Sequence, residues 1–238
     1  MQKHIAEFLL VAVAACVSVA MSANAAPSED ANTAYARGDY VTALRLIRPL
    51  ADHGSASAQY NLGMIYGNGR GVAQDYGAAA RWYRKAADQG MPEAQNNLGQ
   101  LYQKGQGVSQ DYGQAIEWYR KAAVQDKAAA QHNLAMMYDQ GLGVSKNPDE
   151  AAKWYRKAAD QGIARAQHNL AAMYSAGEAG PPDYVQGYKW FHLAATHAPA
   201  WDTEIRTMAV QGRDRLAAHM TASEIAKAQR LAREFVPE

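Results

Sequence analysis

Cysteine is almost absent from this sequence, because Cys16 is the only one among 238 residues. It lies in an apolar N-terminal segment that we expect to be cleaved off after Ala25. The mature chain would then have no thiol and could form no disulfide, even in an oxidising compartment. Non-covalent packing alone would have to stabilise its fold.

An excess of either charge is missing as well. The 24 lysines and arginines face 23 aspartates and glutamates, which gives a formal net charge of +1. Removal of residues 1–25 takes Lys3 and Glu7 together and leaves that charge unchanged. No long-range basic field therefore indicates nucleic acid or an anionic membrane as partner. With 48% hydrophobic residues, the composition is typical of a folded chain.

The N-terminal apolar run is too short to cross a membrane comfortably. It covers residues 8–21, follows the positive Lys3 and precedes the small-residue sequence ANA, a pattern typical of a signal-peptidase site. We predict a signal peptide over 1–25, no membrane span after processing, and a periplasmic or secreted protein of bacterial type. One alternative is a lipoprotein anchored through Cys16, because the VAAC that ends there resembles a weak processing sequence. Another is an uncleaved anchor or a buried helix.

Motifs of catalysis and cofactor binding are also missing. The sequence has no paired carboxylates with supporting context, no Gly-x-Ser-x-Gly elbow and no Ser-x-x-Lys motif. The GNGRG at 67–71 lacks the preceding strand and the following Gly-Lys-Ser/Thr of a phosphate loop. His132 and His168 occupy equivalent positions, but no cysteine or third histidine shares their register to complete a zinc site. We predict a protein that is not an enzyme, with no catalytic, cofactor-binding or metal-binding residue.

The chain carries instead an internal repeat with a period of 36 residues. Four tryptophans mark this repeat, and an alanine, a leucine and a tyrosine recur at the same step. These positions are Trp82, Trp118, Trp154 and Trp190; Ala58, Ala94, Ala130 and Ala166; Leu62, Leu98, Leu134 and Leu170; and Tyr66, Tyr102, Tyr138 and Tyr174. The period divides the chain into repeats at 56–91, 92–127, 128–163 and 164–198.

Each repeat is expected to fold as two helices. The first carries A-Q-x-N-L-(G/A)-x-x-Y, whose apolar and small residues form one helical face. Gly63 and Gly99 on this face would let a neighbouring helix approach closely, and a glycine turn ends the helix. The second helix ends near Gly90 and Gly162, whereas Asp126 replaces that glycine in the second repeat. It begins after a residue that caps helices well, at Asp75, Asp111, Asn147 and Asp183.

The two ends of the chain extend this plan. The register continues backwards into a shorter helix pair over 26–55, but the period stops beyond residue 198. Thr221 and Glu224 form a capping box that predicts a helix to about Phe235. A helical cap over 199–238 would cover the last open face of a stack of repeats.

The combined pattern A-x-x-x-L-G-x-x-Y, G-x-G-V, D-x-x-x-A and W-Y-x-K-A-A-x-x-G resembles the Sel-1-like repeat, a relative of the tetratricopeptide repeat. The resemblance covers about residues 56–198. It implies an all-α fold, an α/α solenoid of helix-turn-helix repeats that acts as an interaction scaffold without enzymatic activity. The fourth repeat departs from the pattern, since Phe191 and Leu193 replace the tyrosine and lysine. Some exported cysteine-rich members have been linked to penicillin recognition, but this chain lacks their cysteine pairs.

The sequence RWYRKAADQG at 81–90 and its later copies combine aromatic with basic side chains. On a helix, Trp82 and Tyr83 fall on one stripe, and Arg81 and Lys85 fall on another. We predict that the aromatic residues pack between helices and the charges face water, because burying tryptophan stabilises more than a surface ion pair. A weak contact with anionic surfaces is left open through the pairs Arg84/Lys85, Arg120/Lys121 and Arg156/Lys157.

A partner site is predicted on the first helices, at positions where the repeats differ. Inter-repeat packing explains the positions that do not differ, Asn61, Asn97, Asn133 and Asn169. By analogy with tetratricopeptide grooves, the varying positions would line the concave face. They are Tyr60, Asn96, His132 and His168 in one row, Met64, Gln100, Met136 and Ala172 in the next, and Gln103 and Asp139 one turn further on. This lining suits an extended peptide or a helix of a partner protein.

The leading hypothesis is an exported, non-catalytic scaffold that binds another protein through this face. One alternative is a cell-wall protein that binds peptidoglycan or acts on it as an enzyme. A purely structural homo-oligomer is the third. No residue pattern identifies the partner.

Overall fold

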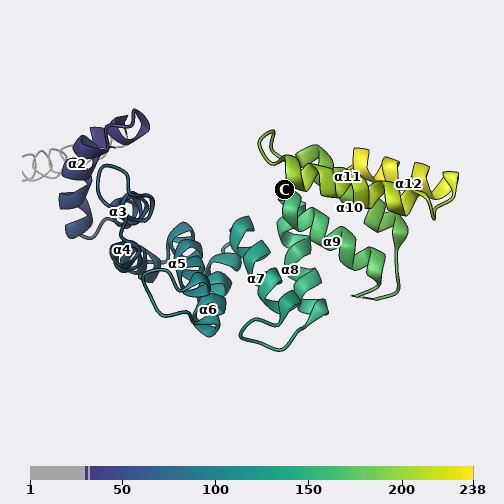
Figure 1. The fold of residues 1–238 in the computed structure, drawn as a ribbon, viewed down its shortest axis with the longest axis horizontal. Coiled ribbons are helices and arrows are strands. Elements are labelled where there is room, and N and C mark those ends of the chain that lie inside the picture. Colours follow the sequence, from purple (N-terminus) through teal and green to yellow (C-terminus); the bar gives the residue numbers. More distant parts are fainter. Residues whose placement is uncertain (1–29, 32, 179, 238) are drawn as a thin grey trace, which may run out of the picture. The chain divides into compact units, whose positions relative to one another are not determined.

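The computed structural model describes residues 30–31, 33–178 and 180–237. Every regular element in these ranges is a helix, and none of these residues forms a strand. The chain is an all-α solenoid of helix-turn-helix repeats, as its period predicts (Figure 1). The expected signal peptide over 1–25 and Cys16 lie outside the described residues.

The helices belong to two compact units, and each unit is described by itself. The first unit extends to Ala94 and includes Gln106–Val108, while the second contains Gln95–Gly105 and continues from Ser109. Helical residues at 30–31 and 33–36 precede the named helices. In the first unit these are α2 (Tyr40–Asp52), α3 (Ala56–Asn68) and α4 (Tyr76–Asp88). Helix α5 (Pro92–Lys104) begins there and continues in the second unit, which also holds α6 (Tyr112–Ala123), α7 (Ala128–Gln140), α8 (Pro148–Asp160), α9 (Ala164–Ala176), α10 (Tyr184–His197), α11 (Thr203–Ala217) and α12 (Ala222–Arg233).

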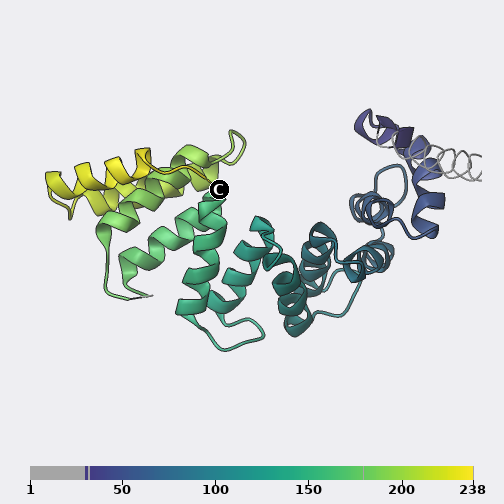
Figure 2. The same ribbon diagram turned by 180° about the vertical axis from the view of Figure 1, so that it is seen from behind.

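Within the second unit, helices that follow one another in the chain also pack against one another. Helix α8 lies between α7 and α9, and α9 packs in turn on α10. Figures 1 and 2, which view the ribbon from opposite sides, both show α7, α8 and α9 side by side. Such local packing is what a stack of two-helix repeats requires, because one repeat alone cannot bury its apolar face.

The second helix of each repeat begins where the sequence predicts. The capping side chain accepts a hydrogen bond from the backbone N–H three residues later, at 2.8 Å for Asp75, 3.0 Å for Asp111, 3.1 Å for Asn147 and 3.0 Å for Asp183. Pro148 occupies the first turn of α8, where its missing N–H costs nothing. These caps satisfy helix N–H groups that have no partner inside the helix.

Glycine turns separate the two helices of a repeat, and one shows why glycine is needed. Gly107 has a φ of +69°, and a Cβ there would lie 2.2 Å from the carbonyl carbon of Tyr76. The turn therefore demands both a left-handed backbone and a missing side chain. Asp126, which replaces the glycine after the second helix, also has a positive φ of 58°. The backbone keeps the shape of the repeat although the residue has changed.

Leucines and close helix contacts form the core of each repeat. Leu62, Leu98 and Leu134 are fully buried, and Leu170 is 2% exposed. The close approach expected at Gly63 is confirmed, because a Cβ there would lie 2.4 Å from the ring of Tyr83. Gly99 has the same relation to Tyr119, at 2.8 Å.

The prediction that the repeat tryptophans are buried is confirmed for three of them and wrong for one. Trp118, Trp154 and Trp190 are 5%, 9% and 0% exposed. Trp82 is only half-buried, because its ring borders a surface pocket. Tyr83 beside it is buried, as expected.

Buried glutamines form a second set of contacts, both between neighbouring helix pairs and within a pair, that the sequence did not predict. Gln131 donates to the carbonyl oxygen of Ala123 at 3.2 Å and accepts from Gln161 at 2.9 Å. Gln59 and Gln89 form the same pair in the first unit, at 2.7 Å. The other members of this glutamine ladder are Gln95 with Gln125 and Gln167 with Ala159 and His197. Their common step of 36 residues was the available signal.

Helices α11 and α12 pack on α10 at the end of the second unit. Gly212 of α11 lies so close to Phe191 that a Cβ would approach its ring to 2.6 Å. The capping box is present, with Thr221 and Glu224 bonded reciprocally, and α12 ends at Arg233, two residues before the expected Phe235. The Phe235 ring packs on Trp190, with 5.4 Å between the ring centroids.

Candidate partner-binding surface

The first predicted row lies beside the aromatic residues of the second helices. Tyr60 contacts Tyr83 in the first unit, with 5.8 Å between ring centroids. In the second unit, His132 lies 5.8 Å from Tyr155 and His168 lies 5.3 Å from Phe191. The row residues Tyr60, His132 and His168 are half-buried. Each one therefore presents part of its ring to the surface and packs the rest within its own repeat.

Asn96, the fourth member of this row, is only 5% exposed. Its side-chain oxygen accepts a hydrogen bond from Asn133 Nδ2 at 2.9 Å, which links α5 to α7. The Nδ2 of Asn96 donates to Asn97 Oδ1 at 3.3 Å. The inter-repeat role expected for Asn133 is confirmed by this contact. Asn96 itself has little surface to offer a partner.

The second row is more open. Met64, Gln100 and Met136 are half-buried, and Ala172 is exposed. Met136 packs against the core of the second unit. Of the ten predicted residues, Ala172 alone is both exposed and part of a described pocket.

Gln103 and Asp139 use their side chains inside the fold. Gln103 Oε1 accepts from the hydroxyl of Tyr119 at 2.6 Å, and Asp139 Oδ2 accepts from that of Tyr155 at 3.2 Å. In the fourth repeat the corresponding residues are Ser175 and Phe191. The hydroxyl of Ser175 donates to Ala171 in its own helix at 2.6 Å. The fourth repeat therefore has neither the tyrosine hydroxyl that donates this bond in the earlier repeats nor the side chain that accepts it.

Burial keeps the two histidines of the first row neutral at pH 7. Desolvation lowers the pKa of His132 to about 4, and it also lowers the pKa of His168. The Nε2 of His132 is buried without a hydrogen-bond partner among the described residues. No three His, Cys, Asp or Glu side chains in the described part of the chain are placed to hold a metal ion. The row therefore offers aromatic and polar contacts without a cation.

In the second unit, a pocket of about 330 Å³ lies between α9, α10 and α11. Ala172 and Phe191 form part of its wall, together with Leu216 of the C-terminal cap. Arg215 adds a basic group. The sequence predicted that Ala172 belongs to the partner-binding surface. It predicted no site residue in α11, because the period of the repeat ends before that helix.

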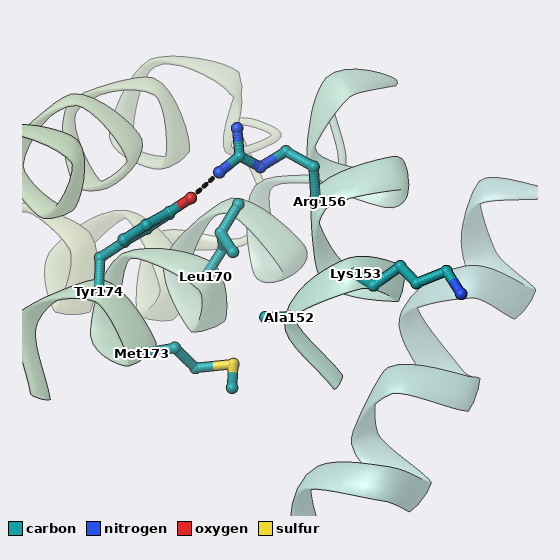
Figure 3. A pocket seen from close by; sticks show the side chains of 6 residues that line it. All are labelled: Ala152, Lys153, Arg156, Leu170, Met173 and Tyr174. Atoms are coloured by element: carbon teal, nitrogen blue, oxygen red, sulfur yellow. Dashed lines mark hydrogen bonds between the residues drawn. The ribbon is translucent and has the colours of Figure 1, made fainter. Parts of the chain in front are cut away.

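A second pocket, of about 290 Å³, lies between α8 and α9 (Figure 3). Its floor is apolar and includes Ala152, Leu170 and Met173. In Figure 3 the guanidinium of Arg156 meets the hydroxyl of Tyr174, to which it donates a hydrogen bond, and Lys153 points away. Ile116, which is 4% exposed, stands one repeat earlier at the position of Ala152. The small alanine therefore leaves the space that the earlier repeat fills.

The basic side chains of the second helices do not all lie free in water. The ammonium groups of Lys85 and Lys121 stand 4.2 and 4.0 Å from the ring centroids of Trp82 and Trp118. Arg120 donates to the hydroxyl of Tyr138 at 2.7 Å. Burial lowers the pKa of Arg156, which lies over the Trp190 ring. The expected exposure holds for Arg81 and Lys85.

Comparison with known protein families identifies the Sel1 repeat. The Sel1 repeat model matches residues 56–91, 92–126, 128–163 and 164–198. Among solved structures, a Sel1 repeat protein from Oxalobacter formigenes is 28% identical, with a TM-score of 0.68 over 82% of this chain and 86% of that one.

A protective antigen of uropathogenic Escherichia coli with an SLR fold is 30% identical, with a TM-score of 0.56. The alignment covers 88% of this chain and 52% of the antigen. No curated protein matches the chain. Among the described residues, no helix has the length and apolar character that a membrane span needs.

Proposed function

The chain belongs to the Sel1 repeat family, and from this premise we propose that it is an exported, non-catalytic scaffold that binds a protein partner along its first helices. Sel1 repeats commonly serve as protein-interaction scaffolds and are generally non-catalytic. The pocket beside Ala172 is the observation that carries the proposal. It joins a varying position of the predicted rows to an apolar cavity.

The chemistry of this pocket suits one apolar side chain of a bound segment. Phe191 and Leu216 supply apolar surface, and the neutral His168 adds an aromatic edge next to Phe191. Apolar anchors that enter a pocket often supply much of the affinity of a protein interface. A partner peptide or helix with an exposed aliphatic or aromatic residue is therefore the expected ligand.

A crosslinking experiment tests this surface. A photoreactive residue placed at Ala172 should capture a partner in intact cells, and mass spectrometry would identify it. Ala172→Arg should then lower the affinity for that partner by about tenfold or more, because the guanidinium fills the pocket. Ala226→Arg, at an exposed position of α12, is the matched control. Equal binding by the two variants, with equal helicity, would move the site elsewhere.

Export is the second part of the proposal and rests on the sequence of residues 1–25. Cell fractionation and N-terminal sequencing provide its test. A periplasmic or secreted chain that begins at residue 26 is the expected result. A blocked chain that begins at Cys16 would indicate the lipid anchor, and an unprocessed cytoplasmic chain would contradict export.

A further inference from the structure

A pocket of about 290 Å³ in the first unit is lined largely by basic and aromatic side chains. It lies among α2, the end of α3, and α4 from its N-cap Asp75 to Lys85. We call it the basic pocket, and its polar and aromatic lining is Arg48, Tyr66, Asp75, Arg81, Trp82 and Lys85. None of these residues belongs to the rows predicted for the protein partner.

The charge of the basic pocket is strongly unbalanced. Three cationic side chains face one carboxylate, that of Asp75, and Asp75 Oδ1 already accepts the N–H of Ala78 at 2.8 Å. Arg48, Arg81 and Lys85 form no ion pair with any described residue. Cations gathered around a cavity without counter-charges attract an anion.

Later in the chain, the arginines that correspond to Arg48 use their guanidinium groups in hydrogen bonds. Arg120 and Arg156 each donate a hydrogen bond to a tyrosine hydroxyl in the next helix. Arg48 and Tyr66 hold the corresponding places, but no hydrogen bond joins them in the described part of the chain. The guanidinium of Arg48 thus keeps its donors available for a ligand.

Two substitutions distinguish this pocket from its counterparts along the chain. The position of Ala78 holds larger polar residues in the later repeats, Gln114, Glu150 and Gln186. The position of Arg81 is Glu117 in the second repeat, and in the third it is Lys153, which pairs with Glu150 at 3.2 Å. Among the described residues, the first repeat combines a cavity with a third cation that forms no ion pair. The half-buried Trp82 forms one wall of that cavity.

We propose that the basic pocket binds a phosphate group. A single arginine can serve both oxygens of a carboxylate, whereas three cations from two helices match an ion with more oxygens and a higher charge. Trp82 and Tyr66 would pack against whatever carries the phosphate. A free phosphate ester and a lipid headgroup share this chemistry.

Calorimetry with inorganic phosphate at low ionic strength is the first test. Phosphate should bind about tenfold or more tightly than acetate, because it engages at least one further cation. Arg81→Glu should lower phosphate affinity by about tenfold or more. Lys121→Glu is the control, because it makes the same change of charge at an exposed position of a second helix that does not line the basic pocket. This control should bind phosphate like the unmodified protein.

Ala78→Gln separates a built pocket from general surface charge. It introduces the residue that the chain itself has at Gln114, keeps all three cations and fills the cavity. We expect phosphate affinity to fall by about tenfold in this variant, with helicity unchanged. Undiminished binding in Ala78→Gln would overturn the proposal, as would equal losses in Arg81→Glu and Lys121→Glu. Acetate binding as tight as phosphate would overturn it as well.

Two further probes distinguish the source of the phosphate. Glycerol phosphate tests a soluble ester, and phosphatidylcholine vesicles with or without phosphatidic acid test a headgroup. If the protein binds either probe and the Ala78→Gln variant does not, the result supports the site and identifies the source of the phosphate group. Failure of both probes and of inorganic phosphate would refute the proposal without affecting partner binding at Ala172, because the two surfaces share no residue.

Discussion

Asp126 is the residue at which the sequence departs from the backbone rule of its own repeat. The equivalent positions are Gly90 and Gly162, with φ values of +91° and +82°. Asp126 adopts a φ of 58°, and its carboxylate receives only a long contact of 3.4 Å from Gln131. The left-handed region is unfavourable for any residue with a Cβ, although aspartate tolerates it better than most. A small conformational cost is therefore stored at this loop.

Replacing this residue with glycine should stabilise the protein. Asp126→Gly relieves the left-handed backbone, and part of the gain is offset by the greater freedom of glycine in the unfolded chain. We expect an increase of about 0.5 kcal/mol in the free energy of unfolding, measured by urea denaturation. Gly90→Ala is the reverse experiment and should lose about 1 kcal/mol, because no atom within 4 Å adds a clash. A destabilised Asp126→Gly would show that the contact with Gln131 outweighs the backbone.

The first-row histidines bear on the kind of partner this protein can bind. Because burial lowers the pKa of both His132 and His168, neither carries a charge at pH 7. Their rings already contact Tyr155 and Phe191. A ligand at this row would meet neutral aromatic edges, which favour an apolar or polar segment over an acidic one.

At the scale of the helices, the buried glutamines of the glutamine ladder connect one helix pair to the next. Gln59, Gln131 and Gln167 each donate to a carbonyl oxygen at the end of the preceding helix pair. Each also bonds to a side chain at the end of the second helix of its own repeat. Gln131 is fully buried and makes both contacts. Buried polar groups contribute strongly when all their bonds are made, and their loss leaves a partner unsatisfied. The ladder therefore makes the register between repeats specific.

Removal of one glutamine should uncouple neighbouring helices. Gln131→Ala removes the hydrogen bonds to Ala123 and Gln161 and leaves a cavity at a fully buried position, and it should cost about 2–3 kcal/mol in the free energy of unfolding. Gln161→Ala removes only the outer member of the pair and should cost about 1 kcal/mol. Urea denaturation followed by circular dichroism measures both changes. Equal losses for the two variants would argue against a special role of the buried amide.

At the scale of the whole molecule, stability in a repeat protein is a sum of repeats and of the interfaces between neighbours. The last repeat has no successor, and α11 and α12 take that place. Phe191 packs against Gly212, and Gln229 donates to the hydroxyl of Tyr188 at 3.3 Å. The C-terminal helices therefore cover apolar surface that would otherwise face solvent.

A chain that ends at Ala198 tests this role. Loss of α11 and α12 should expose the buried Phe191, lower the unfolding temperature and promote aggregation, which size-exclusion chromatography and circular dichroism would detect. A chain that ends at Glu234 loses Phe235 but keeps both helices, and it should remain folded and monodisperse. If the two truncated chains behaved alike, the helices would not be acting as a cap.

The amino-acid sequence by itself determined the repeat, its two helices and most of their ends. Caps such as Asp75, glycine turns such as that at Gly107, and the leucines that recur in each repeat act over a few residues, so a fixed step reveals them directly. Only the tertiary structure decided that Asn96 is buried, that Trp82 borders a cavity, and that the glutamine ladder exists. These features depend on side chains that lie 30 or more residues apart and on the space that small residues such as Ala78 and Ala152 leave between helices. Periodicity predicts which face of a helix is apolar, but it does not show what fills the volume next to it.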